Sequence, residues 1–381
     1  MEKFSIFNAE AVEEFRKEEK LQPFRVKQIF HEIFKNAQID FKEMTTLSKD
    51  LREKLDQKFQ IIPFELDSVH ESAETTKFLF RLPDTNLIES VIMFHFHDII
   101  EGSQEYENNL TTLIDGKKLN RLTLCISSQV GCPVGCIFCV TGKLGFSKNL
   151  SYEAIVSQVL YANHYLKNKL GKREDGTLYS IRNIVFMGMG EPLLNYDNVK
   201  KTVHTLLDQN GFSLSRRHVT ISTSGIIPGI EKMTNDKLGV MLALSLHSPN
   251  QTLRQELIPT ISKVYTLDLL MKAIDDYTAK TDQRMFYEYV MIKDKTDRPE
   301  LAYELAELLK NRNAHLNLIP YNENPAIELE ESSRNKIMNF KNILVEKGIT
   351  VTVRDTLGRG IQGACGQLGY EKVKKGEKVI R

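Results

Sequence analysis

The first part of the chain shows apolar residues at helical spacing. Residues 8–20 (NAEAVEEFRKEEK), 24–37 (FRVKQIFHEIFKNA) and 48–59 (SKDLREKLDQKF) repeat hydrophobic side chains at that spacing, which predicts amphipathic helices. Residues 76–96 form two β-rich runs joined by Pro-Asp-Thr-Asn, which predicts a β-hairpin. We therefore expect an N-terminal accessory domain of helices and a hairpin over residues 1–95.

Two irregular stretches flank the regular part of the chain. Residues 97–119 are polar (DIIEGSQEYENN, then IDGKK), and we expect an inserted loop over 96–120. Residues 356–381 end in the basic run EKVKKGEKVIR, and we expect a short C-terminal segment there.

Between these stretches, β-like and helical runs alternate. Such alternation predicts parallel strands with crossover helices, in an open doubly wound sheet or a complete or partial (β/α) barrel. We place this α/β core at residues 121–355. The strand-like runs are 122–128, 183–189, 218–224, 239–248, 285–292, 315–321 and 349–355, and the helical runs are 151–170, 195–207, 266–280, 298–311 and 332–347.

The strand-like runs end in small or polar residues, as in CISSQ, MGMGE, STSG, SLHSPN and IPYN. In a (β/α) barrel the carboxyl ends of the strands gather on one rim, where catalytic sites lie. We therefore expect these scattered polar residues to converge in space.

Composition narrows the class of protein. The chain has 381 residues and a net charge of +1, so overall charge does not indicate nucleic-acid binding. No apolar run is long enough to span a bilayer, and the N-terminus lacks the pattern of a secretory signal. We expect a cytoplasmic protein, where clustered cysteines more often bind metal or react than form disulfides.

Three of the five cysteines, Cys132, Cys136 and Cys139, lie close together in the loop GCPVGCIFCVTG. Zinc needs four ligands, and no second pair of closely spaced Cys or His residues is present elsewhere in the chain. An iron–sulfur cluster is normally held by four thiolates, so three would leave one iron open to another ligand. A cluster is therefore favoured over zinc, disulfides or isolated structural thiols.

A CxxxCxxC loop after a strand, with an aromatic residue before its last cysteine, resembles the start of the barrel in radical S-adenosylmethionine (SAM) enzymes. The resemblance implies a partial (β/α) barrel and a [4Fe-4S] cluster. It also implies that SAM binds the open iron and is cleaved by electron transfer to a 5′-deoxyadenosyl radical, so that the hard chemistry belongs to the cofactor.

An ordered set of further motifs is similar to the RlmN/Cfr family of RNA adenine methyltransferases. It runs from PFRVKQIF near the N-terminus through GFSKNL, FMGMGEPLLNYDNV, SRRHVTISTSGIIPGI, LSLHSPN and NLIPYN to GACGQL. This resemblance implies that the three clustered cysteines ligate the [4Fe-4S] cluster. It implies SAM contacts at Gly190, Glu191, Ser222, Ser245, Leu246, His247 and Asn322.

The same resemblance assigns roles to the two remaining cysteines and to one carboxylate. Cys365 would accept a methyl group from one SAM, and a second SAM would yield the radical that activates it for attack on adenine. Cys125 would then form a transient disulfide with Cys365 and release the product. Glu89 would take the ring proton as general base. The 96–120 stretch must extend away from the site if Glu89 is to reach it.

We compare three functions for this chain. The first is RlmN-like methylation of adenine carbon 2, in 23S rRNA at the peptidyl-transferase centre and in tRNA next to the anticodon. The second is Cfr-like methylation of carbon 8 of the same rRNA adenine, giving antibiotic resistance. The third is a non-catalytic, metal-containing RNA-binding protein. For the enzyme we expect a flavodoxin or ferredoxin as electron donor, no membrane contact, a monomeric state, and RNA contacts from the N-terminal part.

Overall fold

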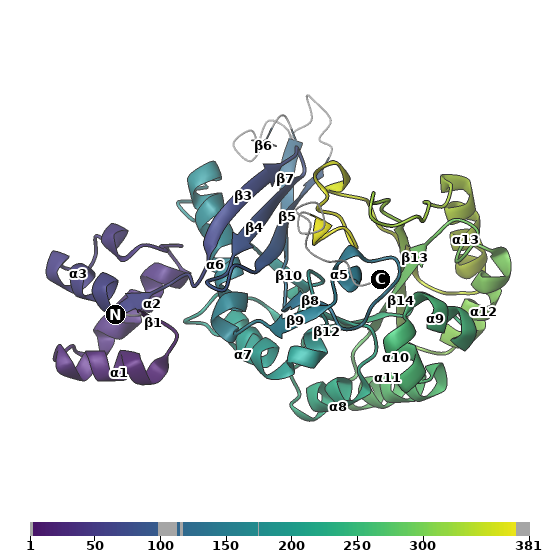
Figure 1. Ribbon diagram of the computed structural model, residues 1–381, viewed down its shortest axis with the longest axis horizontal. Coiled ribbons are helices and arrows are strands. Elements are labelled where there is room, and N and C mark those ends of the chain that lie inside the picture. Colours follow the sequence, from purple (N-terminus) through teal and green to yellow (C-terminus); the bar gives the residue numbers. More distant parts are fainter. Residues whose placement is uncertain (1–2, 98–112, 115–116, 174, 371–381) are drawn as a thin grey trace.

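The computed structural model describes residues 3–97, 113–114, 117–173 and 175–370. Its N-terminal module contains three helices, α1 (Ala9–Glu18), α2 (Pro23–Phe34) and α3 (Lys49–Lys58), at the left of Figure 1. Two short strands, β1 (Phe4–Ser5) and β2 (Phe59–Gln60), pair in parallel and join the two ends of the module. The three predicted helices are present.

The N-terminal module has its own hydrophobic cluster, which includes Phe15, Ile33 and Phe59. The cluster reaches the rest of the chain through Leu160, a residue of α6 (Tyr152–Leu170) that is fully buried. An edge-to-face contact between Phe34 and Phe212, with ring centroids 5.0 Å apart, adds to this interface.

An eleven-stranded sheet forms the centre of the molecule, in the order β15-β14-β13-β12-β11-β10-β7-β5-β4-β3, with β6 paired to β7. The strands from β3 to β7 are antiparallel, and those from β7 through β10 to β15 are parallel. Their bounds are β3 (Glu65–Glu71), β4 (Thr75–Arg81), β5 (Leu87–His97), β6 (Leu113–Ile114), β7 (Lys117–Cys125), β10 (Asn183–Phe186), β11 (Val219–Thr223), β12 (Met241–Ser245), β13 (Met285–Met291), β14 (Ala314–Pro320) and β15 (Val351–Val353).

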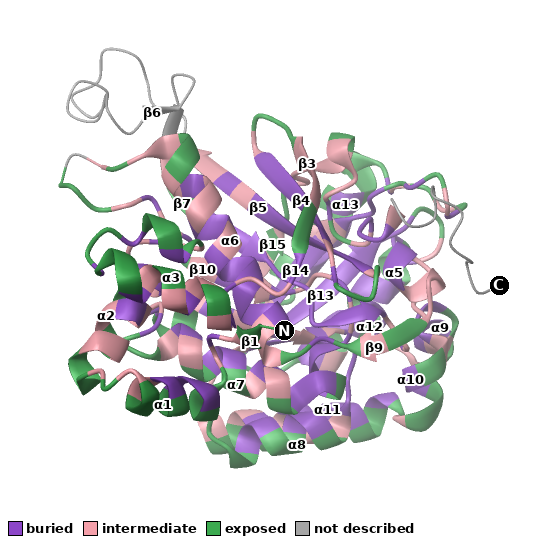
Figure 2. Ribbon diagram, turned by 60° about the vertical axis from the view of Figure 1, so that its left-hand side comes forward, coloured by how far each residue is buried: buried purple, intermediate pink, exposed green. Residues whose placement is uncertain are grey.

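Helices connect the parallel strands, as the alternation predicted. A Ser151 side chain accepts a hydrogen bond from Ala154 N and so caps the start of α6. Strands such as β13 are buried along nearly their whole length (Figure 2), as expected for parallel strands with both faces covered. The other helices of this layer are α7 (Tyr196–Leu207), α8 (Ile227–Asn235), α9 (Gln251–Leu257), α10 (Pro259–Val264), α11 (Leu267–Thr281), α12 (Pro299–Leu309) and α13 (Arg334–Glu346).

Several elements differ from the sequence prediction, among them α8 and β3, which were not predicted. The short helices α9 and α10, between β12 and α11, were not predicted, because Pro259 interrupts their apolar pattern. The strands β5 and β7 extend into the polar stretch as far as His97 and from Lys117. Residues 98–112 of the predicted loop and the basic run 371–381 lie outside the described residues. The division of the chain into four segments stays a prediction, and β3 to β5 are continuous with the main sheet.

Candidate active site

The cysteine loop begins at a turn of a small two-stranded sheet, β8 (Gln129–Gly131) with β9 (Phe146–Asn149). Gly131 has a φ of +72°, and a Cβ atom there would lie 1.9 Å from the carbonyl oxygen of Gly145. The N–H of Cys132 donates to that same carbonyl at 2.7 Å. Only glycine fits this turn, so the start of the loop is fixed by the local backbone.

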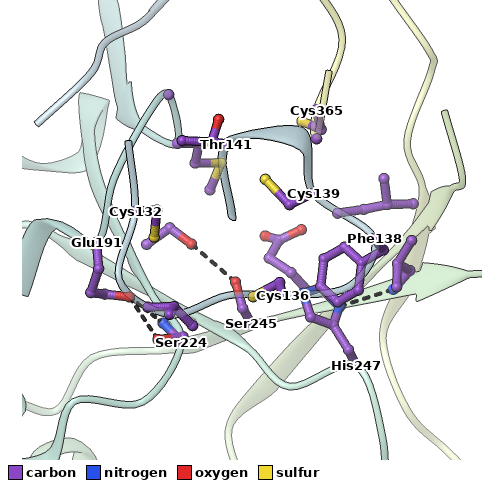
Figure 3. A pocket seen from close by; sticks show the side chains of 18 of the residues that line it. Cys132, Cys136, Phe138, Cys139, Thr141, Glu191, Ser224, Ser245, His247 and Cys365 are labelled. Atoms are coloured by element: carbon purple, nitrogen blue, oxygen red, sulfur yellow. Dashed lines mark hydrogen bonds between the residues drawn. The ribbon is translucent and has the colours of Figure 1, made fainter. Parts of the chain in front are cut away.

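Cys132, Cys136 and Cys139 line one pocket on the inner side of the sheet (Figure 3). Burial raises the pKa of each thiol above its usual value. Backbone N–H groups of the loop donate to the sulfur of Cys132, and N–H groups at the start of α5 (Val140–Lys143) donate to that of Cys139. These hydrogen bonds favour the thiolate form, which is the form that binds metal.

The loop is held against two other parts of the molecule. Ile137 N donates to Leu257 O at 3.0 Å, which ties the loop to the end of α9. Val140 N donates to Gly366 O at 2.8 Å, which ties α5 to the segment that carries Cys365. The cysteines therefore lie between the helical layer and the C-terminal segment.

Gly190 and Glu191 follow β10 and line the pocket. The Glu191 carboxylate is buried, and one oxygen accepts from Ser224 N at 2.7 Å and from Ser224 Oγ at 2.8 Å. Its other oxygen accepts from Leu193 N at 3.1 Å. Burial raises the pKa of Glu191, and these donors oppose the shift. The carboxylate thus joins the ends of β10 and β11.

Ser222, Ser245 and His247 also line the pocket. The two serine hydroxyls, on β11 and at the end of β12, lie 3.5 Å apart. The Nδ1 atom of His247 accepts a hydrogen bond from Val290 N at 3.1 Å. Leu246 differs from them, because its side chain is fully buried in the core and does not line the pocket.

Asn322 and Cys365 complete the pocket from the C-terminal side. The amide nitrogen of Asn322 donates to Cys365 O at 3.1 Å, so the predicted SAM contact holds the C-terminal segment here. Cys365 is an exposed residue, and it lies on the same side of the pocket as Cys139 (Figure 3). The surrounding protein shields the Cys365 thiol from water and so raises its pKa, and the nearby Arg354 guanidinium opposes that rise.

Glu89 lies outside the pocket lining, on β5 behind the C-terminal segment. Its side chain is buried, and one carboxylate oxygen accepts from Gly369 N at 3.1 Å. The other oxygen lies 3.9 Å from Nζ of Lys77, which is buried as well. Lys77 Nζ also donates to Gln362 O at 3.4 Å. This ion pair therefore contacts the C-terminal segment on both sides of Cys365.

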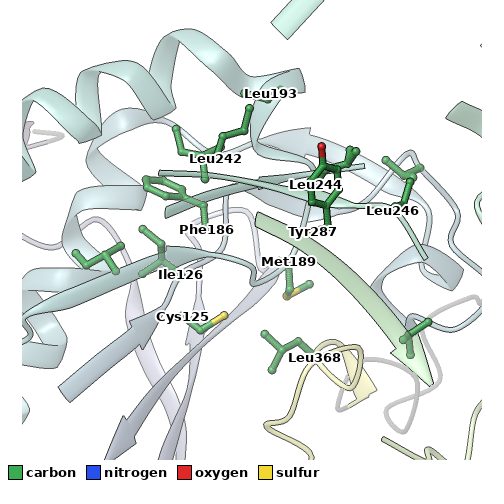
Figure 4. Close-up of a cluster of buried hydrophobic side chains, with 14 of the residues drawn as sticks. Cys125, Ile126, Phe186, Met189, Leu193, Leu242, Leu244, Leu246, Tyr287 and Leu368 are labelled. Carbon is green, nitrogen blue, oxygen red and sulfur yellow. The ribbon is translucent and has the colours of Figure 1, made fainter. Parts of the chain in front are cut away.

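Cys125 lies at the end of β7 within the hydrophobic core, near Met189 and Leu368 (Figure 4). Burial raises the pKa of its thiol, and the charge of Cys365 raises it further, so the two thiols lie close enough to interact. All five cysteines are free thiols in this structure, and the predicted pairing of Cys125 with Cys365 is not formed in it.

Comparison with known proteins shows the family of this chain. Profiles of the radical SAM superfamily and of the ribosomal RNA large subunit methyltransferase N-terminal domain match residues 126–306 and 5–61. Proteins described as probable dual-specificity RNA methyltransferase RlmN, from Dictyoglomus turgidum and Thermotoga petrophila, are 39% and 40% identical, over 93% of this chain and 93% of each relative. The chain belongs to the RlmN family. A crystal structure of a radical SAM methyltransferase from Sphaerobacter thermophilus, 34% identical, superposes with a TM-score of 0.82, covering 96% of this chain and 98% of that one.

Membership of the RlmN family and the radical SAM match imply a [4Fe-4S] cluster and SAM. The described residues contain no group of three His, Cys, Asp or Glu side chains arranged to hold a single metal ion. The donor set still fits a cluster, because each thiolate of a cluster binds a separate iron and the three thiols share one pocket. Hydrogen bonds to two of the sulfurs are also usual for such sites.

Sequence reasoning missed three polar residues of this RlmN-family site. Glu288 is buried, lines the pocket and accepts from Asn317 Nδ2 at 2.8 Å, and burial raises its pKa. A lone carboxylate within the apolar run MFYEYVMI was a signal that could have revealed it. Ser224 belongs to the polar strand end STSG but was not singled out, and Arg254, which bonds to it, gave no signal because arginine in a short helix is common.

Proposed function

We propose that this protein is a radical SAM methyltransferase that methylates carbon 2 of adenine, in 23S rRNA at the peptidyl-transferase centre and in tRNA next to the anticodon. The observation that carries the proposal is the shared pocket: the cysteine loop and Cys365 are far apart in sequence and line one cavity. The printed names of the relatives, dual-specificity RNA methyltransferases, supply the substrate class.

In this proposal the cysteine loop holds the [4Fe-4S] cluster, and the strand ends hold SAM. A bound cluster and SAM supply one electron, a methyl group and the hydrogen-abstracting radical. Gly190 lets the backbone approach a ligand closely, since it has no side chain and a φ of +104°. Ser222 and Ser245 offer hydroxyls toward the same space. Leu246 has only its backbone to offer, since its side chain is buried in the core.

Cys365 accepts the methyl group on sulfur. Its raised pKa means that the thiol must lose a proton before it attacks the methyl carbon. The Arg354 guanidinium favours the thiolate, because an opposite charge stabilises the ionised form. The neighbouring Glu288 carboxyl opposes it when ionised, and burial keeps Glu288 toward its neutral form.

After hydrogen abstraction, the methyl carbon on Cys365 bonds to carbon 2 of adenine. The adduct would return its unpaired electron to the oxidised cluster, Glu89 takes the ring proton, and Cys125 releases the product. Glu89 reaches the substrate only when its contact with Gly369 opens, so the proposal includes movement of the C-terminal segment. The Cys125 thiolate then attacks the sulfur of Cys365. An S–S bond forms, the C–S bond breaks, and the electron pair stays with the methyl carbon, which takes a proton as methylated adenine leaves.

The proposal also includes an electron donor such as flavodoxin or ferredoxin and a monomeric state. None of the helices within the described ranges is both long and apolar enough to cross a membrane.

Nucleoside analysis tests this function. RNA from cells that lack the gene is digested and analysed by mass spectrometry after complementation with the wild-type gene, Cys365→Ala or Gly360→Ala. We expect 2-methyladenosine in 23S rRNA and tRNA with the wild type and no product with Cys365→Ala, because the methyl acceptor is gone. Gly360→Ala is the matched control, since a Cβ there contacts nothing within 4 Å. An exclusively 8-methyladenosine product would refute carbon-2 chemistry, and turnover by Cys365→Ala would refute the thiol mechanism.

A further inference from the structure

Arg254 is a buried cation behind the pocket lining, bonded to Ser224, which lines the candidate site. It lies on α9 and is 0% exposed. One guanidinium nitrogen donates to Ser262 Oγ at 2.7 Å and another to Ser224 O at 2.6 Å, while Nε has no hydrogen-bond partner in the structure. Burial lowers the pKa of Arg254 to about 10, so the group keeps its positive charge at neutral pH.

Within the described part of the chain, no carboxylate neutralises this charge. Arg312 and Arg359 lie 2.8 Å from Asp275 and Glu331, but among the described residues no Asp or Glu lies within ion-pair distance of Arg254. A buried charge without a counter-ion is costly, because water no longer solvates it. Because the fold buries this positive charge, we expect a negative group beside it.

The negative charge nearest in the fold would be that of the cysteine loop. The Arg254 guanidinium donates to Ser224 O at 2.6 Å, and Ser224 and the three clustered cysteines line the same pocket. The backbone bond from Ile137 N to Leu257 O holds the cysteine loop on the helix that carries Arg254. The Arg254 charge also lowers the pKa of His247, which lines the same pocket. This effect helps keep the imidazole neutral.

We infer that Arg254 is a positioning charge for the cluster: it balances the negative charge that the cluster and its three thiolates bring into the pocket, and it raises the reduction potential of that cluster. This inference rests on the proposed function, which places the cluster on Cys132, Cys136 and Cys139.

The sign follows from charge counting. A [4Fe-4S] core held by three thiolates carries one net negative charge when oxidised and two when reduced. Reduction adds one electron from the donor protein, or from the electrode mediators in a titration, and no proton or bond is required. A fixed cation interacts more favourably with the reduced form, and low local polarity strengthens that difference. Removing the cation must therefore make the cluster harder to reduce.

The test is a redox titration of the reconstituted holoprotein under anaerobic conditions, followed by the electron paramagnetic resonance signal of the reduced cluster. Arg254→Gln removes the charge, and Arg254→Lys keeps it. Ser262→Asp neutralises Arg254 in place by adding a carboxylate at its hydrogen-bond partner, and Ser262→Asn is the matched neutral control. Arg312→Gln controls for loss of an arginine that Asp275 already neutralises.

We expect a more negative midpoint potential for Arg254→Gln and for Ser262→Asp, and potentials close to wild type for the other three variants. If Arg254→Gln fails to fold or to retain iron, the comparison of Ser262→Asp with Ser262→Asn decides. Equal potentials in that pair, with full iron content, would overturn the inference. A wild-type protein that binds no iron–sulfur cluster would instead refute the proposed function itself, together with this inference.

Discussion

His247 shows how one residue can combine an unusual backbone, a fixed tautomer and a shifted pKa. Its φ is +57°, a conformation that few non-glycine residues adopt. Because Nδ1 accepts from Val290 N, the neutral ring carries its proton on Nε2. The ring packs edge-on against Phe138, with centroids 4.8 Å apart. The residue therefore offers the pocket a hydrogen-bond donor that carries no charge at neutral pH.

This environment predicts acid sensitivity. Burial, aided by Arg254, lowers the pKa of His247 from 6.5 to about 3. The folded state thus disfavours the protonated ring, so the stabilising contribution is present above pH 6.5 and is lost as pH falls toward about 3. His247→Asn should remove roughly 4 kcal/mol of the decrease in unfolding free energy over that interval, since Asn tolerates positive φ and stays neutral. Urea unfolding of the apoprotein at a series of pH values measures this, and an unchanged pH profile would contradict it.

At the scale of elements, the ends of β10, β11 and β12 build the site. The sequence predicted this rim because each strand-like run ended in small or polar residues, and the structure brings Glu191, Ser222 and Ser245 to one pocket. The close approach depends on Gly190, where a Cβ would lie 2.5 Å from Cβ of Gln129. Gln129 in turn accepts from Glu191 N at 2.8 Å, so a displaced Gln129 would disturb the strand end.

Gly190→Ala should therefore destabilise the protein by about 3 kcal/mol, because backbone strain and overlap with Gln129 add together. Gly171→Ala is the control: its φ is also positive, at +69°, but no atom lies within 4 Å of the added Cβ. The control should cost less, about 1–2 kcal/mol, because it meets backbone strain without the overlap. Chemical denaturation of both variants gives the comparison, and equal losses would show that the contact with Gln129 carries no energy.

The sequence predicted the fold class well and the surroundings of the site less completely. Helical and strand periodicity are local signals, and the α/β fold with N-terminal helices and a hairpin is confirmed. The burial of Arg254 and the contact of Glu89 with Gly369 depend on which distant segments pack together. A short helix containing LRQEL has the same pattern whether its arginine faces water or a cluster site, so periodicity cannot distinguish the two.

At the scale of the whole molecule, an interface of ring contacts and hydrogen bonds joins two hydrophobic clusters. The N-terminal module contacts the barrel through Leu160 and Phe212, and Lys167 Nζ donates to Asn36 O at 3.0 Å. The cysteine loop packs against the main hydrophobic cluster, not against that of the N-terminal module. Binding of the [4Fe-4S] cluster should therefore not require the N-terminal module.

Deleting residues 1–61 tests this separation. We expect the remaining chain to keep its far-ultraviolet circular dichroism and its iron, at reduced stability because Leu160 becomes exposed. Affinity for a tRNA or rRNA fragment should fall on the order of tenfold or more, since folded RNA is bound through extended surfaces. Filter binding and iron analysis of the same preparation provide the measurements. RNA affinity equal to that of the full chain would exclude the N-terminal module from RNA recognition.

The placement of the segment around Cys365 has a consequence for biosynthesis. This segment follows β15, so it leaves the ribosome after every strand of the sheet. Its contacts with α5, Asn322 and Glu89 form only then. Since domains generally fold as the chain emerges, the cysteine loop is synthesised and can fold before the Cys365 segment packs against it. The order of translation therefore completes the cysteine loop first and the wall that carries Cys365 second.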